Sequence, residues 1–204
     1  MQKQLKAHIE RLKAAGATYV DARWYPVEEA NYLMMWNGNL KETTSSRESG
    51  LGVRVLYKNA WGFSASSDVS NLGNLFNTAF DNARVAAERV TFPVRLAEKD
   101  AIQATFSSPS RVDPFGVSLA EKIDFLRSMD EKLNQSGVVQ RVSEMMFVRK
   151  QVVFLDSEGS EIEKNIIEVF PSIQVMGVDS GGESHSRKFL PGRQGNTRGW
   201  ESLD

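Results

Sequence analysis

The sequence predicts an α+β protein in two lobes, with helices packed on one face of sheets that are mainly antiparallel and could include parallel pairs. Three observations support this. Apolar residues recur at helical spacing in three segments, alternating patterns with turn signals fill most of the remainder, and a proline-rich stretch interrupts the chain near its middle. The composition is globular, with 204 residues, 41% hydrophobic, and a net charge of −1.

The first lobe is expected over residues 1–91. Its predicted elements are a helix at 2–15, strands at 19–27 and 32–36, a polar edge strand at 40–46, a hairpin at 51–65 and a helix at 72–90. Asn37-Gly38 is a strong hairpin-turn signal. Ser67 or Asp68 is expected to cap the second helix.

A connector is expected over residues 92–117, which hold three of the six prolines. The second lobe, 118–190, begins with a capping box at Ser118 and Glu121. Its helix is predicted to bury one apolar face, formed by Leu119, Ile123, Leu126 and Leu133. Strands are then predicted at 138–148, 151–155, 161–167 and 170–178. Residues 191–204 lack periodicity and are expected to form a linker, as in a fragment of a longer protein.

The composition narrows the possible functions. The longest apolar runs, such as Val152–Leu155, are far too short to span a membrane, and the N-terminus lacks a signal-peptide core, so a cytoplasmic protein without membrane contact is expected. The balanced charge argues against nucleic acid as a partner. A weaker alternative is single-stranded nucleic acid bound by Arg187, Lys188, Arg193 and Arg198 with Phe189 and Trp200.

Neither a catalytic nor a metal site is predicted within these residues. Asp179-Ser180-Gly181-Gly182 copies a serine-protease tetrapeptide, but no suitably placed histidine base accompanies it. The chain has no cysteine and only two histidines, His8 and His185, whose spacing does not suit zinc. His8 is expected to be a half-buried helix residue and His185 a solvated loop residue.

Several motifs in order resemble the N-terminal region of the TldD/PmbA family of metallopeptidases, once called modulators of DNA gyrase. They are Tyr19-Val20-Asp21-Ala22-Arg23, Trp36-Asn37-Gly38-Asn39-Leu40-Lys41-Glu42, Ser49-Gly50-Leu51-Gly52-Val53-Arg54-Val55-Leu56 and Trp61-Gly62-Phe63-Ser64-Ala65. The hairpin formed by the last two is the most specific part. Leu155-Asp156-Ser157-Glu158-Gly159 resembles a hairpin turn of the same family.

This resemblance implies a parent protein that hydrolyses unfolded peptides or peptide precursors with zinc, as a homodimer or as a heterodimer with a related subunit. The family's zinc-binding HExxxH helix and its cysteine ligand are absent from these 204 residues. The segment is therefore expected to be a non-catalytic part that assists dimer assembly and substrate access, with zinc in a catalytic domain outside it. Arg54 and Trp61 are the candidate chamber or interface residues. Alternatively, Arg54 pairs with a carboxylate such as Glu48, and Trp61 lies in the core.

Two other classes of function stay open at this point. One is a freestanding module that binds peptides or proteins through its sheet edges. The other is a regulator of a DNA topoisomerase system, which follows from the family's older name.

Overall fold

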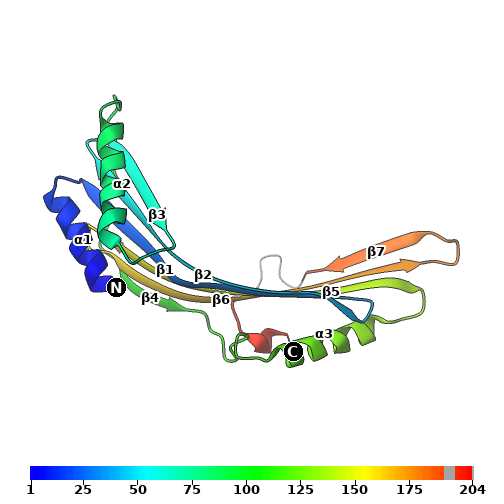
Figure 1. The fold of residues 1–204 in the computed structure, drawn as a ribbon. Coiled ribbons are helices and arrows are strands. Elements are labelled where there is room, and N and C mark those ends of the chain that lie inside the picture. Colours follow the sequence, from blue (N-terminus) through cyan, green and yellow to red (C-terminus); the bar gives the residue numbers. More distant parts are fainter. Residues whose placement is uncertain (191–195, 204) are drawn as a thin grey trace. The chain divides into compact units, whose positions relative to one another are not determined.

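The computed structural model describes residues 1–190 and 196–203 (Figure 1). The elements in chain order are α1 (Gln2–Ala14), β1 (Tyr19–Trp36), β2 (Asn39–Tyr57), β3 (Ala60–Ser66), α2 (Leu72–Ala87), β4 (Gln103–Ser107), α3 (Leu119–Leu133), β5 (Val138–Asp156), β6 (Glu161–Val178), β7 (Ser184–Phe189) and the short 3₁₀ helix η1 (Trp200–Ser202). The seven described strands form one sheet in the order β3-β2-β1-β5-β6-β4, with β7 also paired to β6, and the β2–β3 and β6–β7 pairs are antiparallel. The predicted α+β class is confirmed. No helix among the described residues is both long and apolar enough to cross a membrane.

Four strands are much longer than the sequence predicted. β1, β2, β5 and β6 each run for 18 or 19 residues, where pairs of short strands were expected. In β1 the buried residues lie near the two ends, and the middle is half-buried or exposed. Hydrophobic alternation therefore fades in the middle, while the backbone continues to pair with its neighbours.

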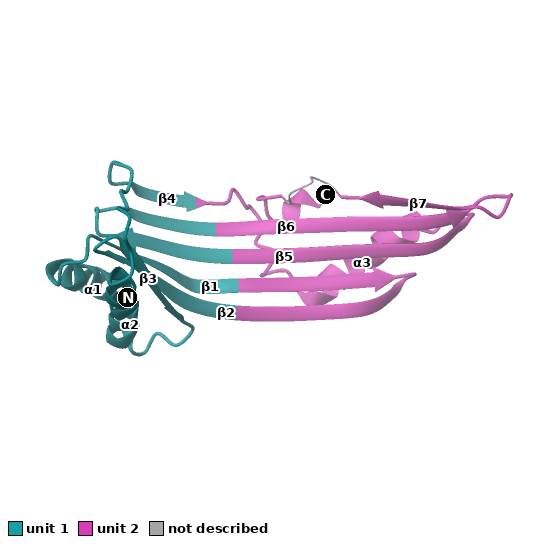
Figure 2. Cartoon of the chain, turned by 90° about the horizontal axis from the view of Figure 1, so that it is seen from above, with its two compact units in different colours: residues 1–28, 48–106, 150–165 teal, residues 29–47, 107–149, 166–204 magenta. Residues whose placement is uncertain are grey.

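The chain forms two compact units that interleave along the sequence (Figure 2). Unit 1 comprises Met1–Glu28, Glu48–Phe106 and Lys150–Asn165, and unit 2 comprises Glu29–Arg47, Ser107–Arg149 and Ile166–Asp204. The lobes predicted at 1–91 and 118–190 were consecutive, whereas these units are not, because each long strand contributes to both. The stretch predicted as a connector, 92–117, includes β4.

In unit 1, α1 and α2 pack on one face of the strands. α1 buries Leu5, Ile9 and Leu12, as its periodicity predicts, and α2 buries Phe76 and Ala79 among others. The strands contribute core residues at alternate positions, which are Val20, Ala22, Leu51, Val53, Val55, Val153 and Leu155. The predicted cap of α2 was wrong, because the side chain of Asn71, not Ser67 or Asp68, accepts the hydrogen bond from the N–H of Asn74.

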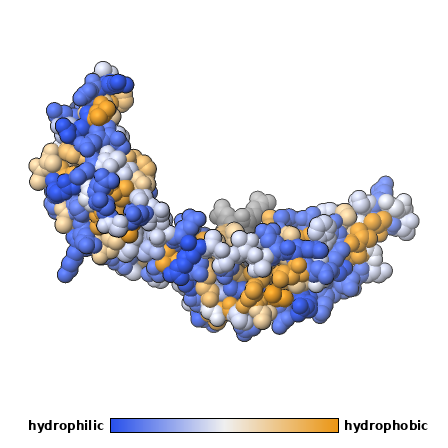
Figure 3. All heavy atoms as spheres, viewed as in Figure 1, coloured by the Kyte–Doolittle hydropathy of each residue, from blue (hydrophilic) through white to orange (hydrophobic). Residues whose placement is uncertain are grey.

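In unit 2, α3 begins at the predicted capping box of Ser118 and Glu121. Leu126 packs with a second core, formed by Leu33, Met35, Met145, Phe147 and Val169. The predicted apolar face was only partly right, because Leu119 is 50% exposed. The buried row of the helix is Lys122, Leu126 and Asp130, spaced four residues apart. Apolar surface is correspondingly visible near α3 (Figure 3).

The C-terminal residues 196–203 are not a free linker. Asn196 pairs with Val169 through backbone hydrogen bonds, and the Trp200 ring lies 5.4 Å from Phe125 and 5.8 Å from Phe147. Residues 191–195 and 204 of the predicted linker lie outside the described residues. Trp200 thus belongs to the core of unit 2, a role that the absence of periodicity concealed.

Candidate functional site

The β2–β3 hairpin of unit 1 sorts its residues onto two faces. Arg54 lies opposite Phe63 in the antiparallel register. Val53 and Val55 belong to the core beneath the helices. Because neighbouring residues of a strand point to opposite faces, Arg54, Trp61 and Phe63 lie on the face that α1 and α2 leave uncovered.

Two glycines of this hairpin lie close to neighbouring groups, and at Gly62 the contact excludes any side chain. A Cβ at Gly62 would lie 2.1 Å from the carbonyl oxygen of Ala79 and 2.3 Å from the nitrogen of Ala83, so only glycine lets α2 approach so closely. A Cβ at Gly52 would lie 3.4 Å from the ring of Phe63, which leans over this position. The Gly-x-Arg and Trp-Gly-Phe spacing of the sequence therefore has a packing reason.

Arg54 is held rigidly by Asp21. Its Nε donates hydrogen bonds to both carboxylate oxygens, at 3.2 and 2.9 Å, and its Nη2 donates to Oδ2 at 2.7 Å. Asp21 is 1% exposed, whereas the Arg54 side chain is 44% exposed. The hydrogen bonds that Arg54 donates to Asp21 raise the pKa of Arg54 above its ordinary value. The carboxylate that Arg54 binds is thus Asp21 and not Glu48.

Trp61 projects from the same face and is 40% exposed, so the alternative that placed it in the core was wrong. The Arg54 guanidinium lies 5.4 Å from its ring centroid, in cation–π geometry. The ring of Tyr19 contacts Trp61 edge-on at 5.9 Å. Burial, followed by the nearby charge of Asp21, raises the pKa of Tyr19, which therefore stays neutral. The indole is fixed on two sides and open on its outer side.

Sequence reasoning found Arg54 and Trp61 but missed Asp21 as the partner of Arg54. A signal was present, because Asp21 and Arg54 stand at equal sequence distances from the two-residue turn Asn37-Gly38. An uninterrupted hairpin with that turn places the two residues opposite each other. The prediction of two interrupted strands hid this relation.

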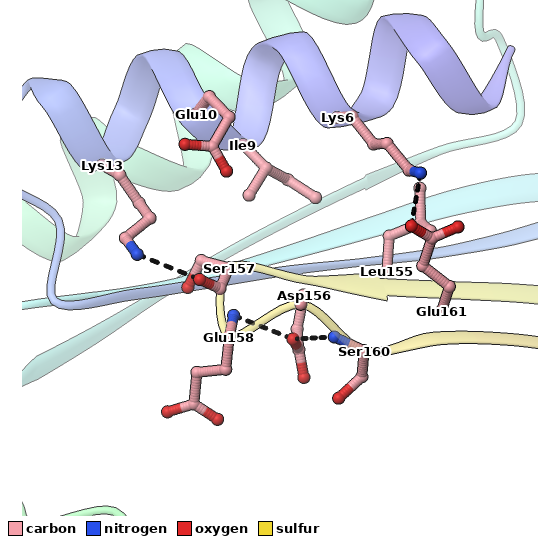
Figure 4. Close-up of a pocket in the computed structure, with 11 residues that line it drawn as sticks. Lys6, Ile9, Glu10, Lys13, Leu155, Asp156, Ser157, Glu158, Ser160 and Glu161 are labelled. Carbon is pink, nitrogen blue, oxygen red and sulfur yellow. Dashed lines mark hydrogen bonds and ion pairs between the residues drawn. The ribbon is translucent and has the colours of Figure 1, made fainter. Parts of the chain in front are cut away.

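A hollow of about 560 Å³ lies between α1 and the β5–β6 turn of unit 1 (Figure 4). The two lysines that line it already have partners, because Lys6 binds Glu161 and Lys13 donates to the carbonyl of Ser157 at 3.0 Å. Neither lysine is therefore left free to bind a ligand in the hollow.

Asp156 organises this turn, which the sequence predicted. Its Oδ1 accepts hydrogen bonds from the N–H groups of Glu158 and Ser160, both at 2.9 Å, and Lys99 binds its other oxygen. Burial would raise the pKa of Asp156, but the hydrogen bonds from Lys99 and the backbone lower it overall. Asp156 is therefore a structural carboxylate.

The described residues offer one cluster of possible metal ligands, Asp179, Glu183 and His185, whose ligand atoms lie within 4.8 Å of one another. All three side chains are exposed, and Asp179 already accepts hydrogen bonds from the N–H groups of Gly181 and Glu183. This open turn does not fit a zinc centre, which needs a desolvated ligand set with ordered support. His8, half-buried on α1, stacks on Phe76 with ring centroids 5.1 Å apart.

The cationic and aromatic residues of the C-terminal part do not form one surface. Arg187, Lys188 and Phe189 are exposed on β7, whereas Trp200 packs into the core of unit 2. Arg193 lies outside the described residues. Trp200 is thus not free to stack on a base.

The fold and motif arrangement define a class, and the chain belongs to the PmbA/TldD metallopeptidase family. The model for domain 1 of that family matches residues 28–83, and the model for its central domain matches residues 112–204. The metalloprotease MJ0996 of Methanocaldococcus jannaschii is 31% identical over 180 residues, which are 85% of this chain and 38% of that protein. The chain thus spans less than half the length of this relative.

Solved structures share the fold. A protein named as a candidate modulator of a DNA gyrase, from Thermotoga maritima, superimposes with a TM-score of 0.72 at 18% identity, covering 100% of this chain and 45% of that one. TldE from Thermococcus kodakarensis superimposes with a TM-score of 0.61 at 9% identity, covering 91% of this chain and 42% of that one.

Proposed function

We propose that this chain is the non-catalytic N-terminal region of a TldD/PmbA-like zinc metallopeptidase of the cytoplasm. The parent enzyme hydrolyses unfolded peptides or peptide precursors and works as a homodimer or as a heterodimer with a related subunit. This region contributes to dimer assembly and to substrate access, and zinc is held by a catalytic domain outside it. Family membership supports the reaction class, and the lack of an HExxxH sequence in these residues supports an accessory role.

The uncovered face of unit 1 is the observation on which this proposal chiefly depends. Trp61 is exposed although it is a large apolar residue, and Arg54 is fixed in place by three hydrogen bonds to a buried carboxylate. Ordered, exposed aromatic and arginine side chains are typical of surfaces that bind proteins or peptides. Arg54 is held in this position by the buried, charged side chain of Asp21, whose burial is itself unfavourable.

The test compares the 204-residue chain with the complete product of the source gene. Each is incubated with zinc and an unfolded reporter peptide, and hydrolysis is followed by mass spectrometry, while light scattering gives the molar mass. We expect the complete product to hydrolyse the peptide and to be dimeric, and the isolated chain to be inactive. Hydrolysis by the isolated chain, or none by the complete product, would refute the proposal.

Two variants of the complete product then test the face itself. Trp61→Ala and Arg54→Lys are expected to lower peptide turnover or weaken the dimer. Phe189→Ala and Arg127→Lys are matched controls, because both residues are exposed and belong to unit 2. If Trp61→Ala and Arg54→Lys behaved like these controls in both measurements, the face would have no part in access or assembly. A freestanding binding module would instead bind peptide with no hydrolysis by the complete product.

A further inference from the structure

A second arginine–aromatic pair lies beside the first on the uncovered face of unit 1. The guanidinium of Arg23 lies 5.4 Å from the ring centroid of Phe154. Val20 and Ala22 point into the core on β1, and Val153 and Leu155 do so on β5. Arg23 and Phe154 therefore share the opposite face with Asp21 and Arg54.

The two pairs extend across four neighbouring strands, β5, β1, β2 and β3. We call the set Arg23, Phe154, Arg54, Trp61 and Phe63 the arginine–aromatic band. Its two β3 residues are exposed aromatic groups, at 40% for Trp61 and 58% for Phe63. Monomeric proteins seldom leave neighbouring large apolar groups uncovered without a binding role.

The band carries more positive than negative charge available to a partner. Arg23 is exposed, and among the described residues no carboxylate lies within 4.0 Å of its guanidinium. The carboxylates on this face are engaged, since Asp21 binds Arg54 and Asp156 binds Lys99. Arg54 uses Nε and Nη2 for Asp21, and among the hydrogen bonds of the described residues none uses its Nη1, so this half-exposed guanidinium keeps donor capacity. Guanidinium groups stacked on rings bind carboxylates with a preset geometry.

Part of the edge of β3 is occupied by α2. The side-chain amide of Asn82 on α2 donates to the backbone carbonyl of Phe63 at 2.9 Å. This carbonyl is thereby occupied by α2, which hinders another strand from pairing there. A partner is expected to lie over the side chains of the band.

We infer that the arginine–aromatic band binds extended peptide segments that carry acidic residues next to aromatic or apolar ones. Carboxylates of the peptide pair with Arg23 and with Nη1 of Arg54. Apolar side chains of the peptide pack on Trp61 and Phe63. This inference rests on the proposed function for the origin of the peptide, because an unfolded substrate exposes such segments.

The test measures binding without hydrolysis, by fluorescence anisotropy of a labelled unfolded peptide with alternating glutamate and tyrosine. A matched peptide has glutamine at each glutamate. We expect the acidic peptide to bind more tightly than the matched one, and the difference to shrink as salt is added. Arg23→Gln is the clean variant, because this side chain is exposed and has no ion pair among the described residues. It is expected to weaken binding of the acidic peptide about fivefold and to leave the glutamine peptide unchanged.

Trp61→Ala is expected to weaken binding of both peptides about tenfold, since the apolar contact does not depend on charge. Arg127→Gln and Phe189→Ala, which alter exposed residues of unit 2, serve as controls and are expected to change neither affinity. Equal binding of the two peptides, or an Arg23→Gln variant that binds the acidic peptide normally, would overturn the inference. Tighter Arg23-dependent binding of a single-stranded oligonucleotide would also overturn it, by assigning the band to nucleic acid.

The two proposals can fail separately. If the complete gene product hydrolyses peptides but Arg23→Gln leaves binding of the acidic peptide intact, the band inference falls and the proposed function stands. If the binding pattern appears as expected but no hydrolysis occurs, the proposed function falls and the band is a peptide-binding surface of another kind of protein.

Discussion

Removing Arg54 from its ion pair with Asp21 should lower the free energy of unfolding more than removing Asp21 does. Asp21 is 1% exposed, so removing Arg54 leaves a carboxylate in the protein interior without its charged donor. Replacement by methionine keeps most of the aliphatic stem and is expected to lower the free energy of unfolding by about 3 kcal/mol. Arg54 is 44% exposed, so it can be hydrated when Asp21 becomes asparagine, and that change should cost only about 1 kcal/mol.

Urea unfolding followed by circular dichroism gives both values, provided that the dependence on urea concentration stays the same among variants. Arg127→Met is the matched control. It removes an exposed arginine that pairs with Asp124 three residues earlier on α3, and its cost should stay below about 0.5 kcal/mol. Equal costs for Arg54→Met and Asp21→Asn, or a cost for Arg54→Met no greater than for the control, would refute the reasoning from burial.

Three further predictions concern other parts of the chain. Gly62→Ala should destabilise unit 1 by roughly 3 kcal/mol or more, because its Cβ would meet the α2 backbone. If the variant unfolded at the same midpoint temperature as the wild type, this prediction would be refuted. Burial, with the hydrogen bond to Glu144, raises the pKa of Tyr32 to about 12. The contribution of Tyr32 to the free energy of unfolding should therefore be full below pH 10 and fall as the pH rises toward 12. Denaturant titrations of Tyr32→Phe should show no such fall. Backbone N–H groups lower the pKa of Glu201 to about 2. Glu201 should therefore hold the C-terminal residues in place fully above about pH 4.5 and lose this effect toward pH 2. Trp200 fluorescence should report the change, and the Glu201→Gln variant should show little of this pH dependence.

The sequence was most informative where side chains are buried. Leu5, Ile9 and Leu12 predicted α1 because burial of one helix face imposes a regular spacing. The capping box of α3 and the turn at Asn37-Gly38 were also predictable, because both depend on short-range hydrogen bonds or backbone angles.

The predictions failed where a charged residue is buried or an apolar residue is exposed. Lys122 is 4% exposed, with its ammonium 4.9 Å from the ring of Phe147 and hydrogen-bonded to Asn31, while Leu119 of the same helix is half exposed. Hydrophobic periodicity cannot reveal a buried lysine whose charge is stabilised by aromatic rings and by a hydrogen bond to an amide oxygen. At the candidate site, Arg54 and Trp61 were found through motif resemblance, whereas Asp21 required the correct length of β1.

The interleaving of the two units has a consequence for how the chain folds during synthesis. Unit 1 needs residues from three segments, the last of which ends at Asn165, so the chain must be synthesised through this residue before the unit can close. Contacts between such distant segments carry a large loop-closure entropy, which typically slows folding. No cut at a single position separates the two units from each other. A chaperone, or a partner that binds the growing chain, would therefore encounter long strands that are still unpaired.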